Sequence, residues 1–337
     1  MRAPDRHAHQ RAGRAARLCP ALGRGPPRPA RPAVTLIAMT GATGFVGQAL
    51  LERALSEGYA VRALTRREQP PRPNLTWIHG DLSDPAALAR LVRGTEAVIH
   101  VAGVVNAPDP AGFEAGNVAG TLGMVEAAKQ SGVRRFIAVS SLSAREPALS
   151  AYGASKAKAE KLVKASGLDW TIVRPAWIYG PGDRETLDMF KAAKWRVVPM
   201  PPKVGRTSVI HVDDLARLLL ALVPPLAAVV RKTVEPDDGR PGGWSHYEMA
   251  RAIGWAVGRR PWVLHLAPRV LALASRLDVA LRKDKAKLTA DRVGYMVHPD
   301  WVVRERARPP KRLWTARIET RQGLCTTADW YRAQGWL

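Results

Sequence analysis

The stretch AMTGATGFVGQAL, residues 38–50, places Gly41, Gly44 and Gly47 between an apolar run and an amphipathic one. Glycines at this spacing let the backbone turn tightly, let a pyrophosphate approach the main chain and let a helix pack closely on a strand. Here they follow the first strand and open the first helix, which is the context that the motif requires. We therefore predict a dinucleotide-binding loop that also uses the residues at the start of that helix, Thr43, Phe45 and Val46.

Strand-like and helix-like segments alternate after this loop, as far as about Arg174. Such alternation predicts right-handed crossovers and therefore an α/β fold with a Rossmann-type, doubly wound parallel sheet. Beyond that point shorter strands (RVVPM, TSVIHV and KTVEP) mix with helices, which predicts a smaller C-terminal substrate lobe. The expected organisation is a tail at 1–33, a dinucleotide-binding domain at 34–175 and a mixed α/β substrate-binding lobe at 176–337, interleaved with the sheet.

Positive charge dominates the composition, with 52 Lys and Arg against 29 Asp and Glu in 337 residues and a formal net charge of +23. Eight arginines lie in residues 1–33. The segment from Arg259 to Arg321 contains sixteen basic residues and six acidic ones. Clustered positive charge attracts nucleic acids and anionic membranes. No RNA-binding signature interleaves aromatic residues with these charges, so we expect no specific nucleic-acid partner and assign most of the charge to solvated surface.

Residues 1–33 are rich in Arg and Pro and have no apolar periodicity. We expect this segment to be disordered, or to result from a misassigned start codon. It has neither the apolar run of a secretory signal nor the composition of a transit peptide. Cys19 and Cys325 form neither a disulfide framework nor a metal-binding spacing, so these features favour a cytoplasmic protein with no metal.

The choice of dinucleotide depends on the end of the second strand, where an acidic side chain would bind the ribose of NAD. The segment VRALTRR has Thr65 there, followed by Arg66 and Arg67, whose guanidinium groups can pair with a 2′-phosphate. We therefore predict NADP, with NAD as the alternative if these arginines are only surface charge. Four residues at the ends of the third and fourth strands are expected to complete the cofactor site: Asp81, Leu82, Ala102 and Gly103.

A second group of chemically important residues lies in AYGASKAKAE, where Tyr152 and Lys156 are four apart and share one helix face. Ser141 precedes them at the carboxyl end of the fifth strand. Tyrosine ordinarily titrates near 10, so acid/base chemistry near neutral pH requires a lower pKa, which Lys156 and a cationic nicotinamide can supply. Ser141 is expected to hydrogen-bond the substrate oxygen.

These motifs together resemble the short-chain dehydrogenase/reductase superfamily, in its extended branch related to NAD-dependent epimerases and dehydratases. The resemblance covers about Val34 to Leu222, where TGATGFVG, GDL, HVAG, VRPAWIYGPG and VIHVDDLA occur in the expected order. It implies that Tyr152 is the catalytic acid/base, that Lys156 orients the ribose and lowers the tyrosine pKa, and that Ser141 positions the substrate. Two further residues match family positions: Asn117 of the central helix and Pro175 of the cofactor site.

The motif VIHVDDLA contains His211, Asp213 and Asp214, which the resemblance implies to be structural. We expect one of the two aspartates to cap the helix DLARLLLAL rather than to form a metal site or a catalytic dyad.

Departures from the family pattern concern the substrate. Sugar-nucleotide dehydratases resemble one another in an Asp-Glu pair where this chain has Leu142 and Ser143, and epimerases tend to carry asparagine where it has Trp177. Ten of the eleven tryptophans lie from Trp170 onward, which favours an apolar pocket. The predicted function is NADP-dependent hydride transfer to or from a carbonyl or secondary alcohol on a steroid-, flavonoid- or lipid-like small molecule.

Two alternatives remain at this point. One is a sugar-nucleotide epimerase that retains NAD. The other is a non-catalytic nucleotide-binding scaffold that resembles the accessory subunit of respiratory complex I, although the presence of Tyr152, Lys156 and Ser141 argues against it. A homodimer is compatible with each of these.

The segment PRVLALASRLDVALRKDKAKL predicts an amphipathic helix with an apolar stripe at Val270, Leu273, Ala274, Leu277 and Leu281. Basic residues lie beside or after that stripe: Arg276, Arg282, Lys283, Lys285 and Lys287. The pattern fits either a peripheral contact with an anionic membrane or an ordinary helix whose stripe packs on the second lobe.

Overall fold

The computed structural model describes residues 35–283 and 286–337. The expected tail at 1–33 and one basic residue of the amphipathic segment, Lys285, lie outside the described residues.

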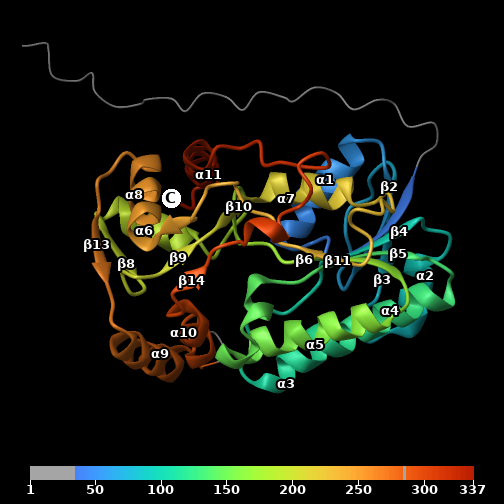
Figure 1. The fold of residues 1–337 in the computed structure, drawn as a ribbon, viewed down its shortest axis with the longest axis horizontal. Helices are drawn as coiled ribbons and strands as arrows, with labels where there is room; N and C mark the ends of the chain where they lie inside the picture. The colour runs from blue at the N-terminus through green and yellow to red at the C-terminus, as the bar shows by residue number, and fades with distance from the viewer. Residues whose placement is uncertain (1–34, 284–285) are drawn as a thin grey trace, which may run out of the picture.

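A seven-stranded, all-parallel sheet forms the centre of the fold, in the order β11-β6-β5-β4-β1-β2-β3 (Figure 1). Its strands are β1 (Leu36–Thr40), β2 (Ala60–Thr65), β3 (Leu75–His79), β4 (Ala97–His100), β5 (Arg135–Val139), β6 (Asp169–Val173) and β11 (Lys232–Val234). The strand order reverses next to β1, as a doubly wound sheet requires. The predicted Rossmann-type fold is therefore confirmed.

Helices cover both faces of this sheet (Figure 1). They are α1 (Phe45–Ser56), α2 (Pro85–Val92), α4 (Gly120–Gln130), α5 (Ala151–Ala165) and α7 (Val212–Ala221). Alternate residues of β1 point to opposite faces: Ile37 packs in a cluster with α1 and α7, whereas Ala38 packs with α2, α4 and α5. This alternation explains why strands buried on both sides are apolar throughout.

The remaining elements build the second part of the molecule. Its strands are β7 (Trp177–Tyr179), β8 (Val197–Met200), β9 (Arg206–Thr207), β10 (Val209–His211), β12 (Trp244–Ser245), β13 (Trp262–His265) and β14 (Asp300–Trp301). Its helices are α6 (Leu187–Lys194), α8 (His246–Ala256), α9 (Pro268–Arg282), α10 (Ala290–Met296) and α11 (Thr320–Ala333), and a short α3 (Pro110–Phe113) lies in the first part. Helices α6, α8 and α11 share one apolar core. The predicted capping box of Ser245 and Glu248 opens α8.

Two details of the prediction beyond Arg174 differ in the structure. The segment KTVEP belongs to the main sheet, because Lys232–Val234 pairs with β6 as its edge strand. Helix α7 is capped by His211, whose Nδ1 accepts from the Asp213 N–H at 3.2 Å, and not by an aspartate. Asp214 instead accepts the backbone N–H groups of Arg317 and Ile318, at 3.0 and 2.9 Å, and thereby anchors the C-terminal segment to α7.

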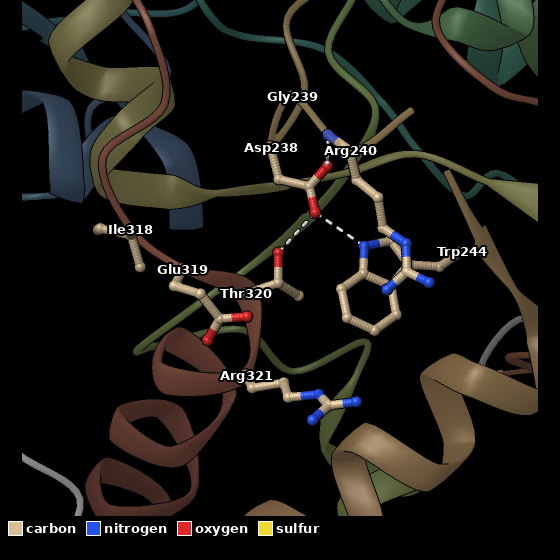
Figure 2. Close-up of a pocket in the computed structure, with 8 residues that line it drawn as sticks. All are labelled: Asp238, Gly239, Arg240, Trp244, Ile318, Glu319, Thr320 and Arg321. Atoms are coloured by element: carbon tan, nitrogen blue, oxygen red, sulfur yellow. Dashed lines mark hydrogen bonds between the residues drawn. The ribbon is translucent and has the colours of Figure 1, made fainter. Parts of the chain in front are cut away.

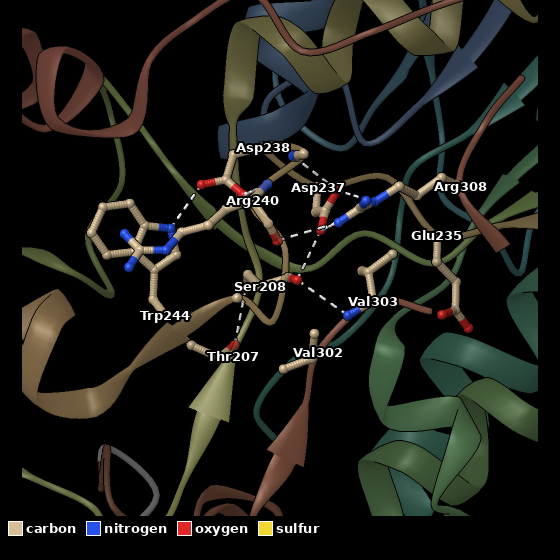
Figure 3. A network of polar contacts seen from close by, with 12 residues as sticks. Thr207, Ser208, Glu235, Asp237, Asp238, Arg240, Trp244, Val302, Val303 and Arg308 are labelled. Atoms are coloured by element: carbon tan, nitrogen blue, oxygen red, sulfur yellow. Dashed lines mark hydrogen bonds and ion pairs between the residues drawn. The ribbon is translucent and has the colours of Figure 1, made fainter. Parts of the chain in front are cut away.

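A buried polar network fastens the second part to the sheet (Figure 3). Asp237 follows β11, accepts the Ser208 hydroxyl at 2.9 Å, and binds Arg308 through both carboxylate oxygens, at 2.9 and 2.8 Å. The Ser208 hydroxyl also accepts the N–H of Val303 at 3.1 Å. Three distant segments are therefore held by one buried carboxylate.

Candidate active site

The glycine loop lies at the carboxyl end of β1, between that strand and α1. Gly41 has φ +74°, and a Cβ there would lie 2.7 Å from the backbone nitrogen of Ala102. A Cβ on Gly47 would lie 1.8 Å from the carbonyl oxygen of Gly41. Gly41 is therefore required for its positive φ and for close backbone approach, and Gly47 is required for close backbone approach alone.

The N-terminus of α1 is open. Its N-cap is Gly44, no side chain of the described residues caps it, and Thr43 and Gly44 are exposed. The first N–H groups of an uncapped helix are free to bind an anion, and the helix dipole favours negative charge there. Phe45 and Val46, which the sequence analysis placed in the cofactor site, begin this helix and are partly buried.

The neighbouring strand ends bring the predicted adenosine contacts together. Arg66 and Arg67 are exposed after β2, and Gly80 after β3 donates to the Thr65 carbonyl at 2.9 Å. Asp81 is held by the Ser83 N–H at 2.8 Å, and its pKa is lowered first by the Ser83 hydroxyl and also by the nearby charge of Arg66. Leu82 packs against α4, where a Cβ on Gly120 would meet it at 2.7 Å.

Ala102 and Gly103 continue from β4 toward the catalytic residues. A Cβ on Gly103 would lie 2.7 Å from Lys156 Nζ and 2.9 Å from Asn117 Oδ1. Asn117 is buried in a π-helical turn, Glu114–Ala119, accepts the Val104 N–H at 2.8 Å and donates to the Ser155 hydroxyl at 2.9 Å. It therefore fixes the loop after β4 against α5.

Tyr152 and Ser141 meet at the carboxyl edge of the sheet. Ser141 follows β5 and accepts the Ser143 N–H at 3.1 Å, and Tyr152 lies in the first turn of α5. Desolvation raises the pKa of Tyr152 to about 12, and the nearby Ser141 hydroxyl only partly opposes this. The carbonyl of Pro175 accepts from the Leu142 N–H at 3.4 Å, which places this residue beside the Ser141 loop.

Lys156 lies one helical turn from Tyr152, but its amine donates to the Val139 carbonyl at 3.3 Å. Burial lowers the pKa of Lys156 to about 8, against the opposing charge of Glu160. Lys156 is not among the groups that shift the pKa of Tyr152. The expected lowering of the Tyr152 pKa by Lys156 is therefore not a property of the chain alone, because desolvation sets the direction of the shift.

Helix α10 covers Tyr152. The sequence analysis did not predict this contact. The rings of Tyr295 and Tyr152 lie 6.2 Å apart between centroids, and Arg292 donates to the Tyr295 hydroxyl at 3.2 Å. Arg292 also pairs with Glu185 from the loop before α6. Asp291 accepts the N–H of Ala151 at the start of α5. No local pattern signals these contacts, because α10 lies about 140 residues from α5 in sequence.

His100 is a second residue that the sequence analysis did not single out. It is buried at the end of β4, where Nδ1 lies 2.8 Å from the Thr40 hydroxyl and Nε2 lies 3.2 Å from that of Thr121. Burial lowers its pKa to about 3, so it is neutral near pH 7. The Thr40 hydroxyl accepts the Ala102 N–H at 3.2 Å. This series of hydrogen bonds therefore supports the loops that surround the glycine turn.

One pocket of the second part differs from the predicted apolar pocket. A pocket of about 430 Å³ lies between the segments 238–244 and 318–321 (Figure 2). Its lining is charged, with Asp238, Arg240, Glu319 and Arg321, and Trp244 is its only tryptophan. Trp177 packs on the second core and donates to Thr186 at 3.3 Å. The described residues contain no group of three or more His, Cys, Asp or Glu arranged to hold a metal ion.

Comparison with known proteins identifies the family. The family model described as NAD(P)H-binding matches residues 41–224. The chain belongs to this family, within the extended short-chain dehydrogenase/reductase superfamily. It is 37% identical over 311 residues to a ceramide reductase of Caulobacter vibrioides, covering 90% of this chain and 96% of the relative. It is 27% identical over 306 residues to a 2-alkyl-3-oxoalkanoate reductase of Stenotrophomonas maltophilia, covering 81% and 92%.

Among solved structures, the UDP-glucose 4-epimerase of Thermotoga maritima matches with a TM-score of 0.66 and 18% identity, covering 89% of this chain and 99% of that one. A likeness at this identity shows the shared fold alone. The chain is thus an NAD(P)-dependent enzyme with reductase and epimerase relatives.

The site fits a nicotinamide dinucleotide. Gly41 and Gly47 have no side chains to block the approach of a pyrophosphate. The uncapped N-terminus of α1 lies at the same loop. When bound, such a cofactor supplies or accepts a hydride. Beside such a cofactor the chain places the phenol of Tyr152, with its proton, and the hydroxyl of Ser141.

Proposed function

We propose that this enzyme is an NADP-dependent reductase that converts a ketone on a long-chain, ceramide-type lipid into a secondary alcohol. The proposal is carried by the position of Tyr152 beside Ser141 at the carboxyl edge of a dinucleotide-binding sheet. The identity to a ceramide reductase over nearly the whole length of both chains supports the substrate class. The second reductase relative is also named for an oxo group on an alkyl chain.

The residues divide the reaction between them. A new C–H bond forms at the carbonyl carbon with the hydride that NADPH carries, and the C=O double bond becomes a single bond. Tyr152 donates its proton to the oxygen as negative charge develops there, and Ser141 hydrogen-bonds the same oxygen. Tyr152 then regains a proton from solvent. One ketone, one NADPH and one proton give one alcohol and one NADP.

The protonation state of Tyr152 supports reduction rather than oxidation. Desolvation raises the pKa of Tyr152 to about 12, so in the free enzyme this tyrosine keeps its proton at neutral pH and can enter the cycle as an acid. Oxidation of an alcohol would instead require the phenolate, which burial disfavours. Reduction therefore uses the protonation state that the chain itself stabilises.

The exposed arginines after β2 support NADP as the dinucleotide. No acidic side chain follows β2 at this point, and Arg66 and Arg67 leave their guanidinium groups in solvent. A 2′-phosphate can accept charge-assisted hydrogen bonds from such groups.

The test is turnover of purified protein with NADPH and an N-acylated long-chain amino ketone, with the alcohol product quantified by mass spectrometry. We expect one alcohol for each NADPH consumed. A sugar-nucleotide epimerase would instead interconvert UDP-sugars with no net NADPH consumption. A non-catalytic scaffold would bind the dinucleotide and turn over neither substrate. Either result would overturn the proposal.

A further inference from the structure

The outer face of the β8–β13 ribbon is apolar and open to solvent. The two strands pair in register, with Trp262 opposite Val197 and Leu264 opposite Pro199. Val198 points inward and is buried, whereas Trp262 is 80% exposed. Trp195, just before β8, is 82% exposed. Large apolar side chains exposed side by side, rather than singly, mark an interaction surface.

Helix α9 follows β13 directly and adds to this surface. Leu271 and Ser275 are its buried residues, so its inward face is narrow. Most of the predicted apolar stripe lies outside: Leu273, Leu277 and Leu281 are exposed, Leu281 by 83%. The expectation that this stripe packs on the second lobe is therefore wrong. Figure 1 shows α9, β8 and β13 together at one end of the molecule, away from β2 and β3.

Basic residues outnumber acidic ones around this surface. Residues 189–203 contain four basic residues (Lys191, Lys194, Arg196 and Lys203) and no acidic ones. Residues 249–277 contain five (Arg251, Arg259, Arg260, Arg269 and Arg276) and again no acidic ones. Lys194 donates to the carbonyl oxygen of the C-terminal Leu337, and Asp278 and Arg282 pair with each other at the far end of α9. The remaining charge is open to an anionic partner.

We propose that this basic apolar surface, formed by β8, β13 and α9, docks the enzyme on an anionic phospholipid bilayer. Tryptophan favours the boundary between headgroups and acyl chains, and leucines on an interfacial helix enter the same depth while flanking Lys and Arg contact anionic lipids. Within the described residues no helix is long and apolar enough to cross a bilayer, so the contact is with its surface.

A second copy of the chain fits this surface less well. A two-fold interface places the same patch of each copy against the other. Two faces with an excess of basic residues would then meet, and like charges brought together in this way repel. An anionic bilayer satisfies the apolar and the positive side chains at once.

The surface is also connected to the catalytic tyrosine. Asp278 of α9 accepts the N–H groups of Lys287 and Leu288, each at 2.8 Å, which sets the start of α10. Helix α10 in turn places Tyr295 against Tyr152. Docking through α9 would therefore bring the bilayer close to the helix that covers the site. The docking proposal does not depend on the proposed reductase function, although it would give such an enzyme access to a lipid substrate.

Vesicle flotation of the full chain tests the proposal, with about 30% phosphatidylglycerol in phosphatidylcholine compared with phosphatidylcholine alone. We expect flotation with the anionic vesicles at low salt and its loss at raised salt. The double variant Leu273→Ser/Leu277→Ser should weaken binding by about tenfold or more, because it removes two apolar anchors. Leu226→Ser, another exposed leucine on the segment between α7 and β11, is the matched control and should bind like the wild type.

Thermal unfolding of each variant shows whether it is folded. The proposal is overturned if the folded wild type does not float with anionic vesicles, if the double variant floats as well as the control, or if the double substitution only converts a dimer into a monomer. Because flotation needs neither substrate nor NADPH, a chain that floats but reduces no ketone would contradict the proposed function and leave the docking proposal intact.

Discussion

Asp291 of α10 accepts the backbone N–H of Ala151, the first residue of the helix that carries Tyr152. The Ser150 hydroxyl accepts the Gly153 N–H at 2.9 Å, so the start of α5 is satisfied by its own N-cap residue and by a side chain about 140 residues downstream. The position of Tyr152 is therefore set partly by the second part of the molecule.

This relationship predicts a kinetic effect at a residue with no chemical role. Asp291→Ala removes a charged acceptor from a helix N-terminus, which typically costs about 0.5–2 kcal/mol of stability. We expect turnover to fall about tenfold, while NADPH affinity changes little, because the glycine loop is untouched. Steady-state kinetics and dinucleotide titration measure the two effects. Asp329→Ala, at an exposed carboxylate on α11, is the control, and an equal loss of turnover there would contradict the positioning role.

Arg66→Asp should shift the dinucleotide preference from NADP toward NAD. A lost charge-assisted contact with the 2′-phosphate costs about 1.5–3 kcal/mol, or roughly a factor of 10 to 150 in NADP affinity. Titration of both dinucleotides measures the shift. Arg306→Asp makes the same charge change at an exposed arginine far from β2 and should leave the preference unchanged. Equal affinity of the wild type for NAD and NADP would show that Arg66 is only surface charge.

The buried Lys156 predicts how stability depends on pH. Its folded pKa of about 8 lies below the ordinary value of 10.5, so between these values the unfolded chain binds more protons than the folded one. The stability contribution of this residue therefore rises with pH from about 8 upward. Above pH 10 the raised pKa of Tyr152 lowers the stability as the pH rises, which opposes the effect of Lys156. The effect of Lys156 is therefore best measured between pH 8 and 10.

Lys156→Met isolates this effect. The free energy of unfolding of the wild type, relative to that of the variant, should increase by about 2–3 kcal/mol as the pH rises from 8 to 10. Urea unfolding in the absence of dinucleotide measures it. A relative stability that stays flat across the window would mean that Lys156 is not desolvated in the free enzyme.

Much of the fold could be predicted from local patterns. The glycine loop, the alternation of strands and helices and the cap of α8 are each encoded within a few residues. The sequence did not predict that β11 joins the main sheet. The strand has three residues and lies about 60 residues after β6, so no local pattern identifies β6 as its partner. His211 caps α7 because the helix begins at Val212, earlier than the predicted DLARLLLAL, so Asp213 and Asp214 lie inside its first turn.

The motif predicts which residues form the candidate site, but it does not predict their environment. The contact of Tyr152 with Tyr295, the bond from Lys156 to the Val139 carbonyl and the exposure of Trp262 arise from tertiary packing. The count of tryptophans predicted an apolar pocket, but Trp195 and Trp262 lie on an exposed surface.

Tyr152→Phe removes the proton donor while keeping the ring that packs against Tyr295. Turnover should fall by about 10² or more, with dinucleotide affinity nearly intact, as expected when a general acid is lost. Turnover within a few-fold of the wild type would exclude Tyr152 as the acid.

The most direct measurement follows deuterium from NADPH labelled at both C4 positions of the nicotinamide into an N-acylated long-chain amino ketone. Wild-type enzyme should give an alcohol with one deuterium on the carbinol carbon for each NADPH consumed, and Tyr152→Phe should give this product at least about 10²-fold more slowly. An alcohol without deuterium, or NADPH consumption that the substrate does not stimulate, would contradict hydride transfer to a lipid ketone by this site.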